Sequence, residues 1–126
     1  MKDIKTIGIY AYIDKDLNII GGLEAQVYHL SKELKSKNEY CISDQIFRSA
    51  ASIGANIREA QYASSKADFI NKLHISLKEA NETGFWLELL LNTDCITQNE
   101  YENLEAQCRE LRVLLIHSLN TAKRSE

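Results

Sequence analysis

Apolar residues recur every three or four positions along four successive segments of this chain, the spacing that places side chains on one face of an α-helix. The segments begin near residues 17, 43, 65 and 97, and only short polar stretches separate them. Helices joined by connections this short lie antiparallel. The pattern therefore predicts an all-α fold, an antiparallel up-down-up-down four-helix bundle over residues 17–126. The sequence has no proline, which helices tolerate better than turn-rich β-sandwiches do.

Local motifs mark where three of these helices should start. Ser65-x-x-Asp68 and Thr97-x-x-Glu100 have the form of capping boxes, in which a hydroxyl and a carboxylate satisfy exposed backbone N–H groups. Ser43 is a candidate N-cap for the second segment. The apolar stripes predict a buried core that includes Ile53, Ile57, Leu73, Leu77 and Leu111.

The first sixteen residues do not fit the helical scheme. Residues 7–13 are β-branched and aromatic enough to favour an extended backbone, and Gly21-Gly22 weakens the start of the first helix. We expect a short non-helical N-terminal arm over residues 1–16. The sequence leaves open whether this arm is extended, packed as a tail or disordered.

Bulk properties exclude several classes of protein. At 126 residues the chain fits a single domain with its own core. A formal net charge of -3 argues against a strongly electrostatic nucleic-acid binder, because Lys and Arg supply most of the affinity for phosphates. No apolar run approaches the roughly 20 residues of a membrane span, and the N-terminus has no signal-peptide pattern. We therefore expect a cytoplasmic protein without a membrane partner.

Patterns for catalysis, cofactors and metals are missing. No Glu is followed by His three positions later, as in di-iron bundles, and His29, His74 and His117 lie on three different segments. Cys108 and His117 would stand about 13 Å apart along one helix, with no group to orient them. We predict no catalytic residue, no cofactor and no metal. The three cysteines, an odd number without CxxC spacing, are expected to be free thiols: Cys41, Cys95 and Cys108.

The second segment carries a polar stripe beside its apolar one. Small residues around Gly54 permit close approach of another backbone, which would justify a glycine that costs about 0.5–1 kcal/mol in a helix. Asn56 would then pair across a helix interface, and Arg48 and Glu59 could make charge-assisted hydrogen bonds there. The alternative for the polar stripe is a face exposed to solvent. For Trp86, the alternative is that it belongs to a wide apolar face packed within one chain. The candidate interface residues are Gln45, Arg48, Ser52, Gly54, Asn56, Glu59 and Trp86.

Several runs of residues resemble one bacterial family. They are Arg48-Ser-x-x-Ser-Ile-Gly-Ala-Asn-Ile-x-Glu-Ala60, Ser65-Lys-x-Asp-Phe69, Lys72-Leu73, Ile75, Leu77-Lys-Glu-Ala-Asn-Glu-Thr83 and Trp86-Leu-Glu-Leu89. These runs, spread over about half of the chain, are similar to the four-helix-bundle proteins first associated with intervening sequences in 23S ribosomal RNA genes. The resemblance implies a short antiparallel bundle that assembles into a homopentamer, without known catalysis. A relative of that family is the accessory variability protein of diversity-generating retroelements, a pentamer that binds a reverse transcriptase and nucleic acid.

Two functions of different class follow from these observations. The first is a homo-oligomeric scaffold, with five copies favoured by the resemblance, that binds a protein or a structured RNA. The second is direct binding of ribosomal RNA or another nucleic acid, including a role as accessory factor to a reverse transcriptase. The charges of the second segment balance and the fourth is net acidic, which weakens the second function. Its candidate contacts are Arg58, Lys66 and Lys72.

Overall fold

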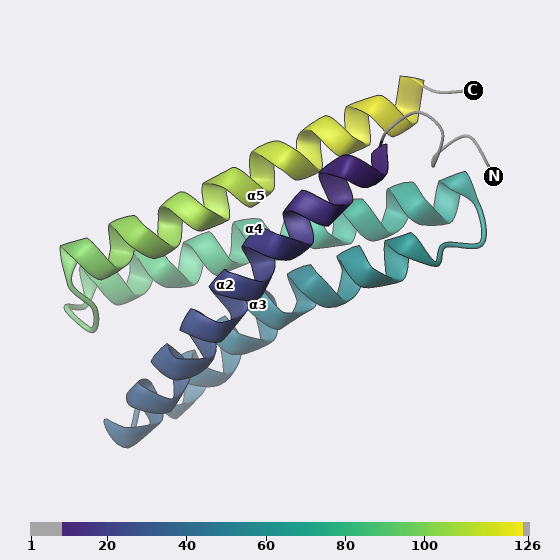
Figure 1. Cartoon of the computed structure of the whole chain (residues 1–126). Coiled ribbons are helices and arrows are strands. Elements are labelled where there is room, and N and C mark those ends of the chain that lie inside the picture. Colours follow the sequence, from purple (N-terminus) through teal and green to yellow (C-terminus); the bar gives the residue numbers. More distant parts are fainter. Residues whose placement is uncertain (1–8, 125–126) are drawn as a thin grey trace.

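The computed structural model of the chain describes residues 9–124, with side chains from residue 21 onward. This part of the chain forms four α-helices and no strand: α2 (Ile9–Ser36), α3 (Tyr40–Gln61), α4 (Lys66–Asn92) and α5 (Gln98–Arg124). Each helix packs against the next one along the chain, and α2 also packs against α5. Figure 1 shows the helices running alternately up and down. The predicted all-α antiparallel bundle is confirmed.

The first helix starts earlier than the sequence pattern suggested. α2 begins at Ile9, so the prediction of a non-helical arm is wrong for residues 9–16, and residues 1–8 lie outside the described part. The β-branched and aromatic composition of this stretch is a weak local preference, which a tertiary setting overrides. Apolar residues also recur at helical spacing from residue 9 up to Leu23, namely Ile9, Ile13, Leu17 and Ile20.

The two capping predictions hold. The backbone N–H of Asp68 donates to Ser65 Oγ at 3.0 Å, while the Asp68 carboxylate accepts from the N–H of Ser64 at 3.2 Å. At the start of α5, the N–H of Glu100 donates to Thr97 Oγ1 at 3.1 Å and the Glu100 carboxylate accepts from the N–H of Thr97 at 2.8 Å. Both motifs satisfy N–H groups that have no partner inside the helix.

Ser43 does not cap α3. That helix begins at Tyr40, and its N-cap, Glu39, makes no side-chain capping bond. Ser43 instead lies buried one turn inside the helix, where its hydroxyl donates to the backbone oxygen of Ser31 at 2.7 Å. The residue joins α3 to α2. The prediction was wrong because a serine before an apolar stripe looks the same in sequence whether its hydroxyl serves its own helix or a neighbouring one.

The core follows the apolar stripes of all four helices. Ile53, Ile57, Leu73 and Leu111 are fully buried as predicted, whereas Leu77 is only partly buried at the edge of the core. Buried hydroxyls of α4 also take part in its contact with α3. Thr83 Oγ1 lies 2.9 Å from Ser49 Oγ, and Ser76 Oγ donates to the backbone oxygen of Ile53.

Two similar turns close one end of the bundle. Asn38 follows α2 with φ of 64° and Asp94 follows α4 with φ of 60°, a left-handed conformation that Asn and Asp tolerate better than most residues. In each turn, the next residue donates its N–H five residues back, Glu39 to Leu34 and Cys95 to Leu90. At this end the α2–α3 pair diverges from the α4–α5 pair, and the start of α2 and the end of α5 lie at the other end (Figure 1).

Candidate interaction face on helices α3 and α4

An ion-pair cluster links the outer faces of α3 and α4. The guanidinium of Arg48 contacts Glu79 at 3.2 Å and also pairs with Glu82. Arg48 Nε donates to the Gln45 amide oxygen at 3.2 Å, and the indole N–H of Trp86 donates to Glu82 at 2.9 Å. Three of the candidate interface residues, Gln45, Arg48 and Trp86, therefore meet within a single chain.

The electrostatics of this cluster keep Glu82 ionised. The hydrogen bond from Trp86 is the main cause that lowers the pKa of the Glu82 carboxyl, and Arg48 adds to it against the opposing effect of burial. The same carboxylates raise the pKa of Arg48, with the hydrogen bond to Glu82 as the largest cause. Because nearly half of the Arg48 side chain is exposed to solvent, which screens the charges, the pairs add little to stability. Their effect is to orient Trp86 at the edge of the face.

The remaining polar candidates have partners inside the chain. The Asn56 amide donates to the backbone oxygen of Ser52 in the same helix at 2.9 Å. Glu59 pairs with Lys72 of α4 at 3.0 Å, an interaction that raises the pKa of Lys72. Asn56 thus makes no bond to another helix in the described structure. That these residues also meet a neighbouring subunit stays a prediction.

Gly54 is buried at the contact between α3 and α2. A Cβ atom added there would lie 3.0 Å from both carboxylate oxygens of Glu24. Burial raises the pKa of the Glu24 carboxyl, and Arg58 opposes the shift. The nearest atoms to Gly54 are therefore those of a side chain of α2, and the close approach of another backbone stays a prediction.

Gly54→Leu is expected to lower the free energy of unfolding by about 1–3 kcal/mol, the usual range for overpacking a filled interior. Its matched control is Gly54→Ala. The Glu24 carboxylate ends a flexible side chain and can move by a few tenths of an ångström to admit one methyl group. Alanine also gains up to about 1 kcal/mol of helix propensity. Urea unfolding followed by circular dichroism measures both variants, and a Gly54→Leu protein as stable as the wild type would contradict this placement.

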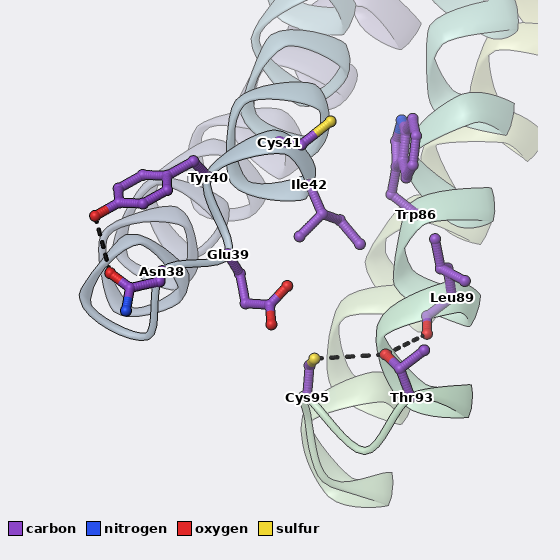
Figure 2. A pocket seen from close by; sticks show the side chains of 9 residues that line it. All are labelled: Asn38, Glu39, Tyr40, Cys41, Ile42, Trp86, Leu89, Thr93 and Cys95. Carbon is purple, nitrogen blue, oxygen red and sulfur yellow. Dashed lines mark hydrogen bonds between the residues drawn. The ribbon is translucent and has the colours of Figure 1, made fainter.

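A cleft of about 500 Å³ opens beside the cluster, where the two helix pairs diverge. Figure 2 shows Glu39 and Ile42, from the start of α3, facing Trp86 and Leu89 of α4 across it. The thiols of Cys41 and Cys95 also line the cleft, and both are free. Sequence reasoning missed this cleft because it depends on how the helix pairs diverge. The visible signals were Trp86 and Leu89, whose three-residue spacing places them on one side of α4.

The three nucleic-acid candidates lie around the α3–α4 turn, at the opposite end. Arg58 is in the last turn of α3 and Lys66 opens α4. Lys72 lies two turns further along α4 and is paired with Glu59. The structure therefore brings Arg58 and Lys66 to this turn and places Lys72 farther from it.

The described residues contain no group of three or more His, Cys, Asp or Glu side chains that could hold a metal ion. The cysteines are free thiols as predicted. Cys108 is buried, and burial raises the pKa of its thiol to about 12. Within the same residues, no helix is long and apolar enough to cross a membrane.

The four antiparallel helices define a small all-α helical-bundle protein. The chain matches the 23S rRNA-intervening sequence protein family over residues 21–117 and belongs to that family. It is also similar to the crystal structure of a protein of unknown function from the S23 ribosomal protein family of Bacteroides thetaiotaomicron VPI-5482. The two share 44% sequence identity and a TM-score of 0.83, covering 86% of this chain and 98% of the other. No curated protein matches the chain. The predicted resemblance is confirmed.

Proposed function

We propose that this protein is a non-enzymatic scaffold of the cytoplasm that assembles with copies of itself and binds a protein or a structured RNA. The observation that carries the proposal is the set of large apolar side chains left exposed on helix faces. Phe85 and Leu89 of α4, and Val113 and Ile116 of α5, are examples. Each of these two pairs is spaced by three or four residues, so its side chains are neighbours on one face of the helix. Exposed apolar patches of this kind mark interaction sites.

Self-assembly is the simplest way to cover these side chains. The resemblance to pentameric relatives favours five copies, and the helix geometry does not by itself choose a number. An assembly would also bring several copies of the α3–α4 face to one partner, which strengthens binding without any new contact per copy.

Light scattering after gel filtration tests the assembly. We expect a mass several times the 14.4 kDa of one chain, with five times that mass favoured. The mass should fall on dilution if the contact is weak, so the measurement covers micromolar to nanomolar protein. A monomer at micromolar concentration would refute the scaffold proposal.

Direct binding of ribosomal RNA is the second candidate. It is supported by the cations Arg58 and Lys66 near the α3–α4 turn, with Lys123 and Arg124 in the last turn of α5 at the same end (Figure 1). A filter-binding titration with 23S rRNA fragments across a salt series discriminates. Direct phosphate contacts require the logarithm of the affinity to fall linearly with the logarithm of the salt concentration. Arg58→Ala should then weaken binding, whereas Lys78→Ala, in the middle of α4, should not.

A further inference from the structure

We propose that the outer stripe of α5 docks onto the α4 ridge and the adjoining cleft of a second copy. The outer stripe consists of Arg109, Val113, Ile116, Asn120 and Lys123. The α4 ridge consists of Phe85 and Leu89, with Trp86 and the cleft beside it. This inference rests on the proposed self-assembly, and it specifies which two surfaces meet.

The outer stripe has the pattern of a docking helix. Its residues recur at intervals of 4, 3, 4 and 3, which places them on one face of α5. All five are exposed, and the two apolar ones are 49% and 46% exposed. Arg109 and Lys123 lie on either side of the apolar pair, about 21 Å apart along the helix. This face of α5 therefore offers an apolar centre with a cation at each end.

The receiving surface has the complementary pattern. Phe85 is 58% exposed and Leu89 is 36% exposed, one helical turn apart on α4. The cleft beside Leu89 has space for a branched aliphatic side chain. Carboxylates accompany this surface: Glu39 lines the cleft, and Glu88 and Asp94 directly precede Leu89 and Cys95, which also line it.

Three of these carboxylates are available to a partner. Glu39, Glu88 and Asp94 are exposed, and none of them forms an ion pair with another residue in the described part of the chain. Glu79 and Glu82, by contrast, are already paired with Arg48. Unpaired carboxylates around an apolar cleft attract a segment that carries Lys or Arg around an apolar anchor, because opposite potentials steer and align the contact. The outer stripe of α5 is such a segment, and every copy of the chain contains one.

The two surfaces share no residue, so the contact is heterologous: each copy uses its stripe on one neighbour and its cleft on another. Heterologous contacts close into a ring when the rotation between copies divides the circle. The proposed contact therefore explains how one type of interface could build a closed assembly of more than two subunits.

One variant on each side tests the contact in the full-length protein. Ile116→Glu places a carboxylate in the stripe, opposite the acidic rim, and Leu89→Lys places a cation on the ridge, opposite Arg109 and Lys123. Each variant alone is expected to reduce the mass to that of one chain. Val113→Glu and Phe85→Lys form a second pair with the same expectation, should either first variant fail to fold. Tyr62→Glu is the matched control, because Tyr62 is 84% exposed outside both surfaces and should leave the assembly intact.

Mixing the two variants gives the decisive result. The Leu89→Lys copy retains an intact stripe and the Ile116→Glu copy retains an intact ridge, so an equimolar mixture should assemble at least to a heterodimer of twice the chain mass. The two altered surfaces carry opposite charges, so they can also pair and extend the assembly beyond the heterodimer. Variants that keep the wild-type mass, or folded monomers that do not pair on mixing, would overturn this contact while leaving self-assembly in place. A wild-type monomer would instead refute the proposed function itself.

Discussion

Phe69→Ala is expected to lower the free energy of unfolding by about 3–5 kcal/mol, the range for removing a buried aromatic side chain. Phe69 has no exposed surface and is among the largest fully buried side chains of the core. The loss combines the transfer energy of the ring with the cavity left between packed helices. Since small domains are stable by only about 5–15 kcal/mol, this variant should be partly unfolded at moderate urea concentrations. Urea unfolding followed by circular dichroism at 222 nm measures the change.

Tyr62→Ala is the control for this prediction. Its ring lies outside the core and outside the proposed contact between copies, so the expected change stays within about 0.5 kcal/mol. Both variants should be compared at the same protein concentration, because assembly makes the apparent stability depend on concentration. Equal stability of the two variants would show that Phe69 does not contribute to the core as the structure indicates.

The sequence predicted most of the fold because the information was periodic or local. Ile53 and Ile57 lie on an apolar stripe whose length and spacing fit a helix and not a strand. Ser65 and Thr97 cap their helices by accepting a hydrogen bond from the residue three positions later. The errors arose where local and tertiary preferences conflict. Residues 9–16 prefer extended backbone locally but continue a helix, and Ser43 bonds to a different helix from its own.

The sequence singled out some residues of the candidate face, but neither their partners nor the cleft beside them. Arg48 was predicted to make charge-assisted hydrogen bonds, and its carboxylate partners, Glu79 and Glu82, lie more than thirty residues away on α4. Gly54 stood out as a position of close approach, and its neighbour proved to be Glu24 of α2. Helical spacing reports only on residues within the same helix. Contacts between helices depend on their relative rotation and divergence, which no spacing rule supplies.

Cys108 should make the protein lose stability above pH 9. Burial, with a smaller contribution from Glu105, raises the pKa of this thiol from 9.0 to about 12 in the folded state. The thiol must remain neutral in the fold but ionises once the chain unfolds. The contribution of the thiol to the free energy of unfolding is therefore fully present below pH 9. It is lost as the pH rises toward 12, at a slope approaching about 1.4 kcal/mol per pH unit. Over three units the loss approaches about 4 kcal/mol.

Cys108→Ala isolates this effect from the tyrosines and lysines that also titrate in alkali. The variant lacks the ionisable group, so it should be less stable than the wild type at pH 8, and the difference should shrink and then reverse between pH 9 and 11. Urea midpoints at several pH values, in the presence of a thiol reductant, give the two curves. Reaction with a thiol reagent at pH 8 provides an independent check, because exposed Cys41 should react at once and Cys108 only after denaturant is added. A difference between the two proteins that does not vary with pH would mean that the buried thiol ionises as easily in the fold as in the unfolded chain.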